Sequence, residues 1–216
     1  MGTEVKRTSH DSPLAPRKTP RQKRAQTTVD CILQATEELV RKHGFSQIGT
    51  RLIAERAGVS IGSLYQYFPT FESILLSWYE GVATSAARKM KIATVDVIDI
   101  DLESSIRITV RALLRVYEDH ALVLIRMPAE VPEIGRAIAS TSFERLNRAV
   151  MRLFFNQHHE FAPRDTDRHI FFIESILLNV LRQYVVERPR GVTRKAVLDE
   201  LSRLLAAYLA GHRGSG

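Results

Sequence analysis

The chain has 216 residues, of which 44% are hydrophobic and 25% are charged, proportions that are ordinary for a globular protein in water. No apolar run approaches the roughly 18 residues that a membrane-spanning helix needs, and the first 26 residues lack the apolar stretch of a secretory signal. The single cysteine, Cys31, excludes an internal disulfide framework and fits a reducing compartment. The sequence therefore predicts a cytoplasmic protein without a membrane segment, in which Cys31 packs on a helix.

The net charge of +7 is concentrated at the N-terminus. Residues 1–26 contain seven Lys or Arg against two acidic residues, whereas residues 27–75 contain four against five, and residues 76–216 twenty against seventeen. Three prolines make residues 1–26 a poor helix, so a disordered arm is predicted there. A basic arm is either a solvated tail or a phosphate-seeking segment beside a nucleic-acid-binding module. Its cations nearest to the folded part are Arg17, Lys18, Arg21, Lys23 and Arg24.

Four helices are predicted in the part of the chain that follows the arm. The first begins at Thr27, which forms a capping box with Asp30, and the second and third cover residues 50–57 and 61–67. The fourth begins after residue 70 and has apolar positions as far as Val82. The residues expected to cap or end these helices are Thr27, Gly44, Thr50, Ser60, Pro69 and Thr70.

The rest of the chain also has helical periodicity, after a break that is expected over residues 93–101. A fifth helix is predicted over 102–117, a short buried helix over 120–128 that Pro128 ends, and a long helix over 134–157. Two final helices are predicted over 166–187 and 193–210. No segment has the period of a strand, so the fold class is all-α with about nine helices. The predicted domains are residues 27–75 and residues 76–216.

The two short helices at 50–57 and 61–67 have the spacing of a helix-turn-helix, in which the second helix enters the major groove of DNA. Gly58 can adopt a positive φ in the turn, and Leu64 and Phe68 are spaced to face a core. A small helical corner without a nucleic-acid role is the alternative interpretation of this spacing alone. The residues left to face outward are Ile61, Gly62, Ser63 and Gln66.

The stretch "TRLIAERAGVSIGSLYQYFPTFESIL" at 50–75, preceded by a helix that ends in "HGF", resembles the DNA-binding domain of the TetR family of bacterial regulators. The resemblance implies that Arg51 reaches a base edge and that Ile61 meets a thymine methyl group. It departs at Phe71, where the family usually has a phosphate-binding Lys, and the basic arm is our candidate replacement for that cation. The DNA-binding residues expected on the helix-turn-helix are Thr50, Arg51, Ser60, Ile61, Gly62, Ser63, Tyr65, Gln66 and Tyr67.

For the larger domain, the resemblance implies a homodimer in which the last two helices pack against their mates, and an effector pocket among the middle helices. The residues expected at the dimer interface are Phe172, Ile176, Val180, Tyr184, Leu201, Leu205 and Tyr208. The residues expected to line the pocket are Leu113, Tyr117, Leu124, Met127, Phe143, Leu146, Phe154, Ile173 and Leu177, although for any one of them ordinary core is the favoured interpretation. Polar residues that could orient a ligand there include Arg107 and Asn179.

The predicted function is therefore a homodimeric, DNA-binding transcriptional regulator. We expect a repressor that a small apolar or aromatic effector releases from a pseudo-palindromic DNA operator. One alternative is a helical adaptor that has lost DNA binding, and another is a helical-bundle enzyme, which the lack of a Glu-x-x-His pair disfavours. Neither a cofactor nor a metal is expected, because the acidic and histidine residues around His158 have no metal-ligand spacing.

Overall fold

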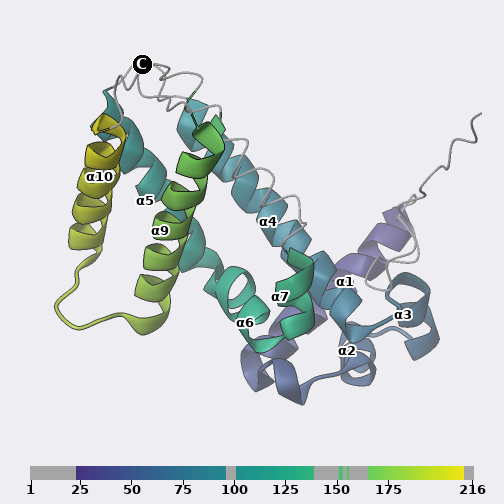
Figure 1. The fold of residues 1–216 in the computed structure, drawn as a ribbon. Coiled ribbons are helices and arrows are strands. Elements are labelled where there is room, and N and C mark those ends of the chain that lie inside the picture. Colours follow the sequence, from purple (N-terminus) through teal and green to yellow (C-terminus); the bar gives the residue numbers. More distant parts are fainter. Residues whose placement is uncertain (1–22, 96–100, 139–150, 153–154, 156–164, 212–216) are drawn as a thin grey trace, which may run out of the picture. The chain divides into compact units, whose positions relative to one another are not determined.

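The computed structural model of the chain describes residues 23–95, 101–138, 151–152, 155 and 165–211, which contain helices and no strand, as the sequence predicts (Figure 1). These residues form two compact units. The first unit contains residues 23–79 and 127–137, and the second contains residues 80–126 and the described residues from 138 onward. Each unit is described by itself below.

The first unit begins with α1 (Lys23–His43), which starts four residues before the predicted Thr27. The predicted capping box is therefore wrong, and the reason is that residues 23–26 (KRAQ) are all good helix formers. Gln26 donates a hydrogen bond of 2.8 Å to Asp30 across the first turns of this helix. The predicted end is confirmed, because the helix stops before Gly44, whose φ is +80°.

A short 3-10 turn, η1 (Phe45–Gln47), leads to α2 (Thr50–Ala57) and α3 (Ile61–Tyr67). Both helices have the predicted bounds, but Gly49 is the N-cap of α2, so Thr50 is its first helical residue and not its cap. Ser60 caps α3 as predicted, since its Oγ accepts a hydrogen bond of 3.0 Å from the Ser63 backbone N–H.

The next helix, α4 (Phe71–Val95), runs from the first unit into the second. Thr70 caps it as predicted, and the cap is reciprocal. The Ser73 N–H donates to Thr70 Oγ1 at 3.1 Å, and the Thr70 N–H donates to Ser73 Oγ at 3.2 Å. The helix continues past residue 93, where the sequence predicted a break, and residues 96–100 lie outside the described part of the chain.

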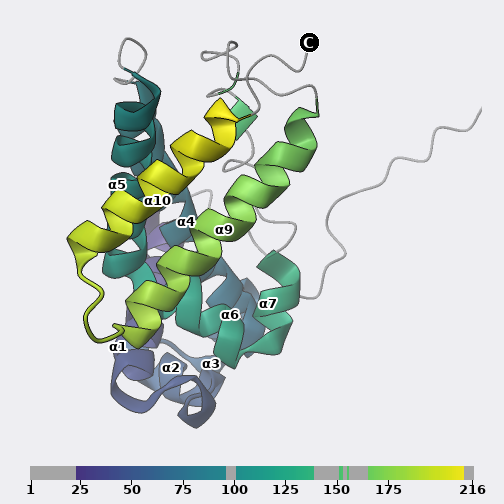
Figure 2. The same cartoon turned by 60° about the vertical axis from the view of Figure 1, so that its left-hand side comes forward.

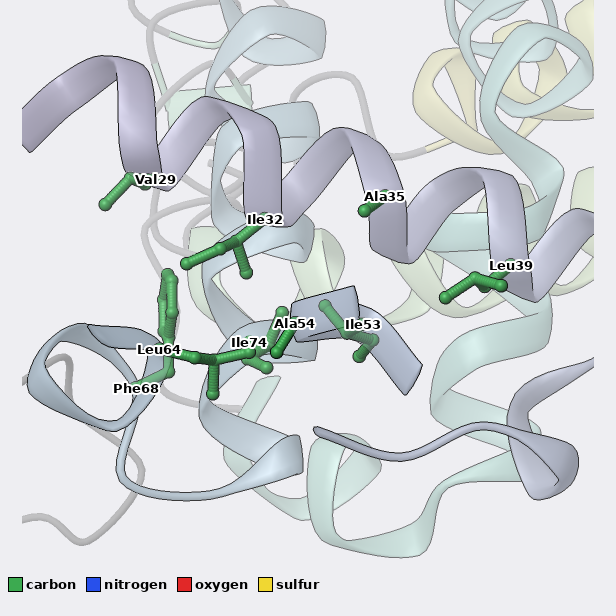
Figure 3. Close-up of a cluster of buried hydrophobic side chains, with 9 residues drawn as sticks. All are labelled: Val29, Ile32, Ala35, Leu39, Ile53, Ala54, Leu64, Phe68 and Ile74. Atoms are coloured by element: carbon green, nitrogen blue, oxygen red, sulfur yellow. The ribbon is translucent and has the colours of Figure 1, made fainter. Parts of the chain in front are cut away.

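The helix-turn-helix is held by a core to which α1, α2, α3 and the start of α4 all contribute (Figure 3). Ile32, Ile53, Leu64 and Ile74 are fully buried in it. Each such aliphatic side chain contributes roughly 1.5–3 kcal/mol on burial, which fixes α3 against α1 and α4. Cys31 is exposed and takes no part in this core, because it lies one residue away from the buried face that Val29 and Ile32 define.

Two further helices, α6 (Met127–Glu130) and α7 (Pro132–Ile138), supply residues 127–137 of the first unit. Pro128 does not end a helix as predicted but is the second residue of α6, which continues to Glu130. A Cβ on Gly135 would lie 2.8 Å from the Pro128 carbonyl oxygen, so α7 requires glycine there. The predicted long helix lies outside the described residues beyond 138, apart from residues 151–152 and 155.

The second unit contains the rest of α4, α5 (Leu102–Ala121), α9 (Thr166–Glu187) and α10 (Arg194–Ala210). The helix α5 packs against both α9 and α10, and those two helices contact each other (Figure 2). Asp101 caps α5 by accepting a hydrogen bond of 3.0 Å from the Ser104 N–H. A non-helical φ/ψ at His120 separates α5 from a second, buried helical segment, as predicted. This segment is the π-helix η2 (Leu122–Arg126), which continues directly into α6.

Ion pairs attach the C-terminal helices of the second unit to α5. Asp199 on α10 accepts hydrogen bonds from Lys195, at 2.7 Å, and from Arg107 on α5. These two cations, Lys195 first, hold the pKa of Asp199 below its ordinary value. Glu118 near the end of α5 accepts from Arg194 at 3.2 Å and lies 3.7 Å from Arg188. Arg107 therefore serves helix packing, where the sequence had suggested a ligand contact.

The sequence was expected to contain no segment apolar enough to span a membrane. By length and composition alone, however, α9 is apolar enough to do so. Of the apolar window that meets this test, 39% is buried inside the chain. One helix of this kind is weak evidence for a membrane, since core helices of water-soluble proteins share the same composition. A helix that packs on two sides is apolar over a wide arc of its surface, and α9 contacts both α5 and α10.

Candidate nucleic-acid interface

The turn between α2 and α3 has a geometry that requires glycine at position 58. Gly58 adopts φ +67° and ψ +29°, the left-handed conformation that side-chain-bearing residues avoid. Its N–H bonds to the Glu55 carbonyl at 3.2 Å, and the Val59 N–H bonds to the Ala54 carbonyl at 3.0 Å. Both bonds satisfy carbonyl groups at the end of α2, so the chain turns sharply into α3.

The helix α3 is anchored on one side and open on the other. Leu64 and Phe68 are buried in the core, as their spacing predicts (Figure 3). Ile61 is 43% exposed and Tyr65 41% exposed, although both have large apolar surfaces that a core would normally take. Gly62 and Gln66 are also exposed, whereas Ser63 and Tyr67 are half-buried. The outward face of α3 therefore consists of the residues that the sequence assigned to DNA.

Two hydroxyl groups join the start of α2 to this face. Thr50 Oγ1 and Tyr65 Oη lie 3.0 Å apart and share one hydrogen bond, in which either can be the donor. Because each hydroxyl carries one hydrogen, the pair keeps one O–H that can donate outward. A single donor beside an exposed helix face suits a phosphate oxygen, and both residues are among those that the sequence assigns to DNA binding.

The charges around the helix-turn-helix are partly neutralised within it. Arg56 on α2 forms an ion pair with Glu38 on α1, which also accepts a hydrogen bond of 3.1 Å from Gln34. Hydrogen bonds from Gln34 first and Arg56 second lower the pKa of Glu38. Arg51 is exposed and makes no ion pair with any residue that the structure describes. Arg51 is thus a guanidinium group on the helix-turn-helix that is available to DNA.

Phe71 is the first residue of α4, where the resemblance would place a Lys. It is half-buried and packs against the core of the helix-turn-helix. The residue therefore contributes apolar contact to the fold and no charge to the interface. Among the cations of the predicted arm, Arg17, Lys18 and Arg21 lie outside the described residues, whereas the backbone of Lys23 and Arg24 forms the first turn of α1.

The predicted effector-pocket residues are spread over both units. Met127 is buried in the first unit, and five others are buried in the second unit. Three lie outside the described part of the chain, so a pocket lined by the whole set stays a prediction. The five buried in the second unit are Leu113, Tyr117, Leu124, Ile173 and Leu177, and the three outside the described part are Phe143, Leu146 and Phe154. Asn179, suggested as a ligand contact, donates instead to the Ser175 carbonyl of its own helix at 2.7 Å.

The predicted dimer residues differ in their exposure. Phe172 and Val180 on α9 are exposed, and Ile176 and Tyr208 are half-buried. The other three predicted residues, Tyr184, Leu201 and Leu205, are buried inside the single chain and offer little surface to a partner. Sequence reasoning missed the exposed apolar residues Phe171 and Val186 on α9 and Leu204 on α10. For Leu204 the reason is that leucine occurs on more than one side of α10, so its spacing does not show which side faces α5.

The described residues contain no group of three or more His, Cys, Asp or Glu side chains that could hold a metal ion. Of the residues that raised the question of a metal, His158 lies outside the described part of the chain, and His169 is buried on α9. The His169 ring nitrogen Nδ1 lies 2.8 Å from the Asp165 carbonyl oxygen, so that nitrogen is engaged in the first turn of the helix.

Family comparisons match both parts of the chain. Residues 32–77 match the bacterial regulatory proteins of the tetR family, and residues 101–209 match the tetracyclin repressor-like C-terminal domain. The second match alone covers half of the chain. The first match contains α2 and α3, the helices whose outward face was described above.

Sequence relatives are also transcriptional regulators. An uncharacterised HTH-type transcriptional regulator of Mycobacterium tuberculosis is 23% identical over 159 residues, which cover 74% of this chain and 77% of the relative. The HTH-type transcriptional repressor KstR of Rhodococcus jostii is 46% identical, but only over 46 residues, which are 21% of this chain and 22% of the relative.

Solved structures show the same fold at low sequence identity. The flavonoid-responsive regulator FrrA has a TM-score of 0.69 at 20% identity, covering 88% of this chain and 100% of that chain. The fatty acid degradation regulator FadR from Bacillus halodurans has a TM-score of 0.60 at 18% identity, with coverage of 87% and 96%. A TetR-family transcriptional regulator from Streptomyces coelicolor has a TM-score of 0.56 at 18% identity, with coverage of 86% and 99%.

Proposed function

Because this chain belongs to the tetR family of bacterial regulatory proteins, whose members are transcriptional regulators and not enzymes, we propose that it is a ligand-responsive repressor. It binds a pseudo-palindromic DNA operator as a homodimer, through residues 27–75, and a small apolar or aromatic effector bound within residues 76–216 releases it. Since DNA is its partner, it acts in the cytoplasm.

The DNA-binding part of the proposal is supported mainly by the outward face of α3. Ile61 and Tyr65 are each more than two-fifths exposed on a short helix whose other side is fixed in a core. Exposed apolar groups on a rigid helix mark an interaction surface. The Thr50–Tyr65 hydroxyl pair adds a phosphate donor to that surface, and Arg51, which forms no ion pair within the described residues, adds a base-reading group.

The apolar surface of α9 and α10 supports the homodimer. Phe172 and Val180 on α9 and Leu204 on α10 are all exposed on helices that contact each other. A second copy that packs its own α9 and α10 against them buries these residues. A two-fold dimer reads a pseudo-palindromic site, with its half-sites separated by about one helical turn or a multiple of it.

The response to an effector follows from population shift. A ligand that binds one dimer conformation more tightly than another changes DNA affinity by that difference. Leu113, Tyr117 and Leu177 lie on α5 and α9, which pack together, so the groups available for ligand contact there are apolar and aromatic. This composition supports an apolar or aromatic effector.

The basic residues before and at the start of α1 are proposed to provide positive charge that the helix-turn-helix lacks. Phe71 cannot bind phosphate as a Lys would, and Arg56 is occupied by Glu38, so the helix-turn-helix is poor in free cations. Arg17, Lys18 and Arg21, together with Lys23 and Arg24 in the first turn of α1, supply the missing attraction to phosphate.

The DNA-binding proposal is tested with the full chain and DNA fragments from upstream of neighbouring genes, with fluorescence anisotropy in excess non-specific competitor. We expect tight binding to at least one fragment and a loss of roughly tenfold or more in affinity for Arg51→Ala, since a bidentate base contact is worth about 1–3 kcal/mol. Lys42→Ala is the matched control, because it removes one exposed cation of the same unit away from α3. Wild-type binding no stronger than that of competitor DNA would favour the alternative, an adaptor without DNA recognition.

A further inference from the structure

Most hydroxyl groups on the outward face of α3 are engaged within the protein. Ser60 Oγ accepts from the Ser63 N–H at 3.0 Å and donates its own hydrogen to Ser63 Oγ at 2.9 Å. Thr50 Oγ1 and Tyr65 Oη are bonded to each other. These bonds hold the geometry of the module. The hydroxyl capacity that remains can bind either a donor or an acceptor on a base edge, so it does not tell one base from another.

Gln66 differs from these residues. It is exposed, and it makes no hydrogen bond with any residue in the described ranges. Its amide offers donors and an acceptor together on one group. That combination matches N6 and N7 of adenine in the major groove, the base edge that glutamine binds in bidentate fashion.

The space around Gln66 is open because of Gly62, which lies four residues earlier on the same side of α3. Helix side chains lean toward the N-terminus, so Gly62 and Gln66 share one side of α3. A Cβ built on Gly62 would have only Ser60 Oγ within 4 Å, at a distance of 4.0 Å. The fold therefore does not need a glycine at position 62, and the helix surface beside Gln66 carries no side chain there.

We propose that Gln66 reads an adenine of the operator half-site, over a helix surface that Gly62 keeps bare. This inference rests on the DNA-binding function proposed above and adds to it a specificity-determining residue. Ile61, which is exposed at the start of the same helix, contacts a thymine methyl group. The half-site therefore contains A·T pairs at the positions that these two side chains reach. Thr50, Ser60 and Tyr65 position α3 without selecting a base.

The test is selection of bound duplexes from a random pool by the full chain, followed by sequencing. Wild type is compared with Gln66→Ala, Gln66→Glu and the control Gln47→Ala, which removes an exposed glutamine of the same unit from η1. Circular dichroism checks that each variant folds, which is expected because Gln66 is exposed and alanine favours helix.

We expect one half-site position to prefer adenine in wild type and in Gln47→Ala. That preference falls by roughly tenfold or more in Gln66→Ala, and it moves to cytosine in Gln66→Glu because a carboxylate accepts from cytosine N4. A Gln66→Ala motif that keeps every adenine preference overturns the assignment of Gln66 while leaving the regulator function intact. A wild-type pool without any enriched motif overturns the DNA-binding function itself, and the assignment with it.

Discussion

Gly62→Ala is expected to raise the stability of the fold and to lower its affinity for DNA. The structure has room for the added methyl group, because a Cβ there has only Ser60 Oγ within 4 Å, at a distance of 4.0 Å, and the backbone is not in the positive-φ region. Alanine is better than glycine in a helix by about 0.5–1 kcal/mol. We therefore expect the free energy of unfolding to rise by about this amount, and the midpoint of thermal unfolding to rise by roughly 1–4 °C.

DNA binding is expected to change in the opposite direction. The methyl group stands on the exposed face of α3, where it holds the helix away from the floor of the major groove. We expect operator affinity to fall by at least roughly tenfold, which corresponds to about 1.4 kcal/mol. The two quantities are measured on the same preparation, by calorimetry and by fluorescence anisotropy.

Gly81→Ala is the matched control for this prediction. Gly81 is an exposed helical glycine of α4 with nothing within 4 Å of an added Cβ, and it lies outside the helix-turn-helix. We expect the same gain in stability and no change in operator affinity. If Gly62→Ala binds the operator as tightly as wild type does, the bare face of α3 does not approach DNA and the reasoning is refuted.

Three more predictions follow from the charged and apolar surfaces. Deleting residues 1–22 should weaken operator binding and reduce the slope of log K against log salt by about 0.9 for each phosphate that the arm neutralises, and an unchanged slope would show that the arm does not bind DNA. Val180→Arg and Leu204→Arg should give monomers in sedimentation experiments while the exposed control Ile92→Arg stays dimeric, and dimers in all three would place the interface elsewhere. Asp199→Asn should lower the free energy of unfolding at neutral pH, because Lys195 and Arg107 stabilise the carboxylate. The folded-state pKa of Asp199 is lowered, so its contribution is present above the ordinary value of 3.8 and is lost as pH falls through the folded-state pKa. The difference between wild type and Asp199→Asn should therefore shrink in acid, whereas Asp119→Asn, which removes an exposed pair at 3.9 Å, should show almost none at any pH.

The helix-turn-helix could be predicted almost to the residue because its signals are local. A glycine in the left-handed conformation, a serine cap and a proline after the last turn each act within a few residues. The bounds of α2 and α3 follow from Gly58, Ser60 and Pro69. The two residues that anchor α3, Leu64 and Phe68, follow from helical spacing alone.

Features that depend on residues far apart in the chain could not be read from the sequence. The bond between Thr50 and Tyr65 spans fifteen positions, and only the folded structure shows that it joins these two hydroxyl groups. The ion pair of Arg56 with Glu38 is similar, since the local spacing on α1 gives no hint of it. Leucines of α10 that look equivalent in the sequence divide into buried and exposed ones only because α5 covers one side.

The π-turn η2 shows another limit of periodicity. Residues 120–128 are apolar enough for a buried helix, and Val123, Leu124 and Ile125 are indeed buried. A non-helical φ/ψ at His120 precedes η2, and η2 continues directly into α6, which contains Pro128. Hydrophobic pattern reports burial there and does not distinguish an α-helical turn from a wider one.

The most direct test of the central claim is a hydroxyl-radical footprint of the full chain on its selected duplex. We expect two protected patches related by two-fold symmetry, with centres about one helical turn or a multiple of it apart, and loss of both patches in Arg51→Ala. Uniform protection along the duplex, or protection that Arg51→Ala leaves unchanged, would contradict the proposal that α2 and α3 of a dimer recognise a specific operator.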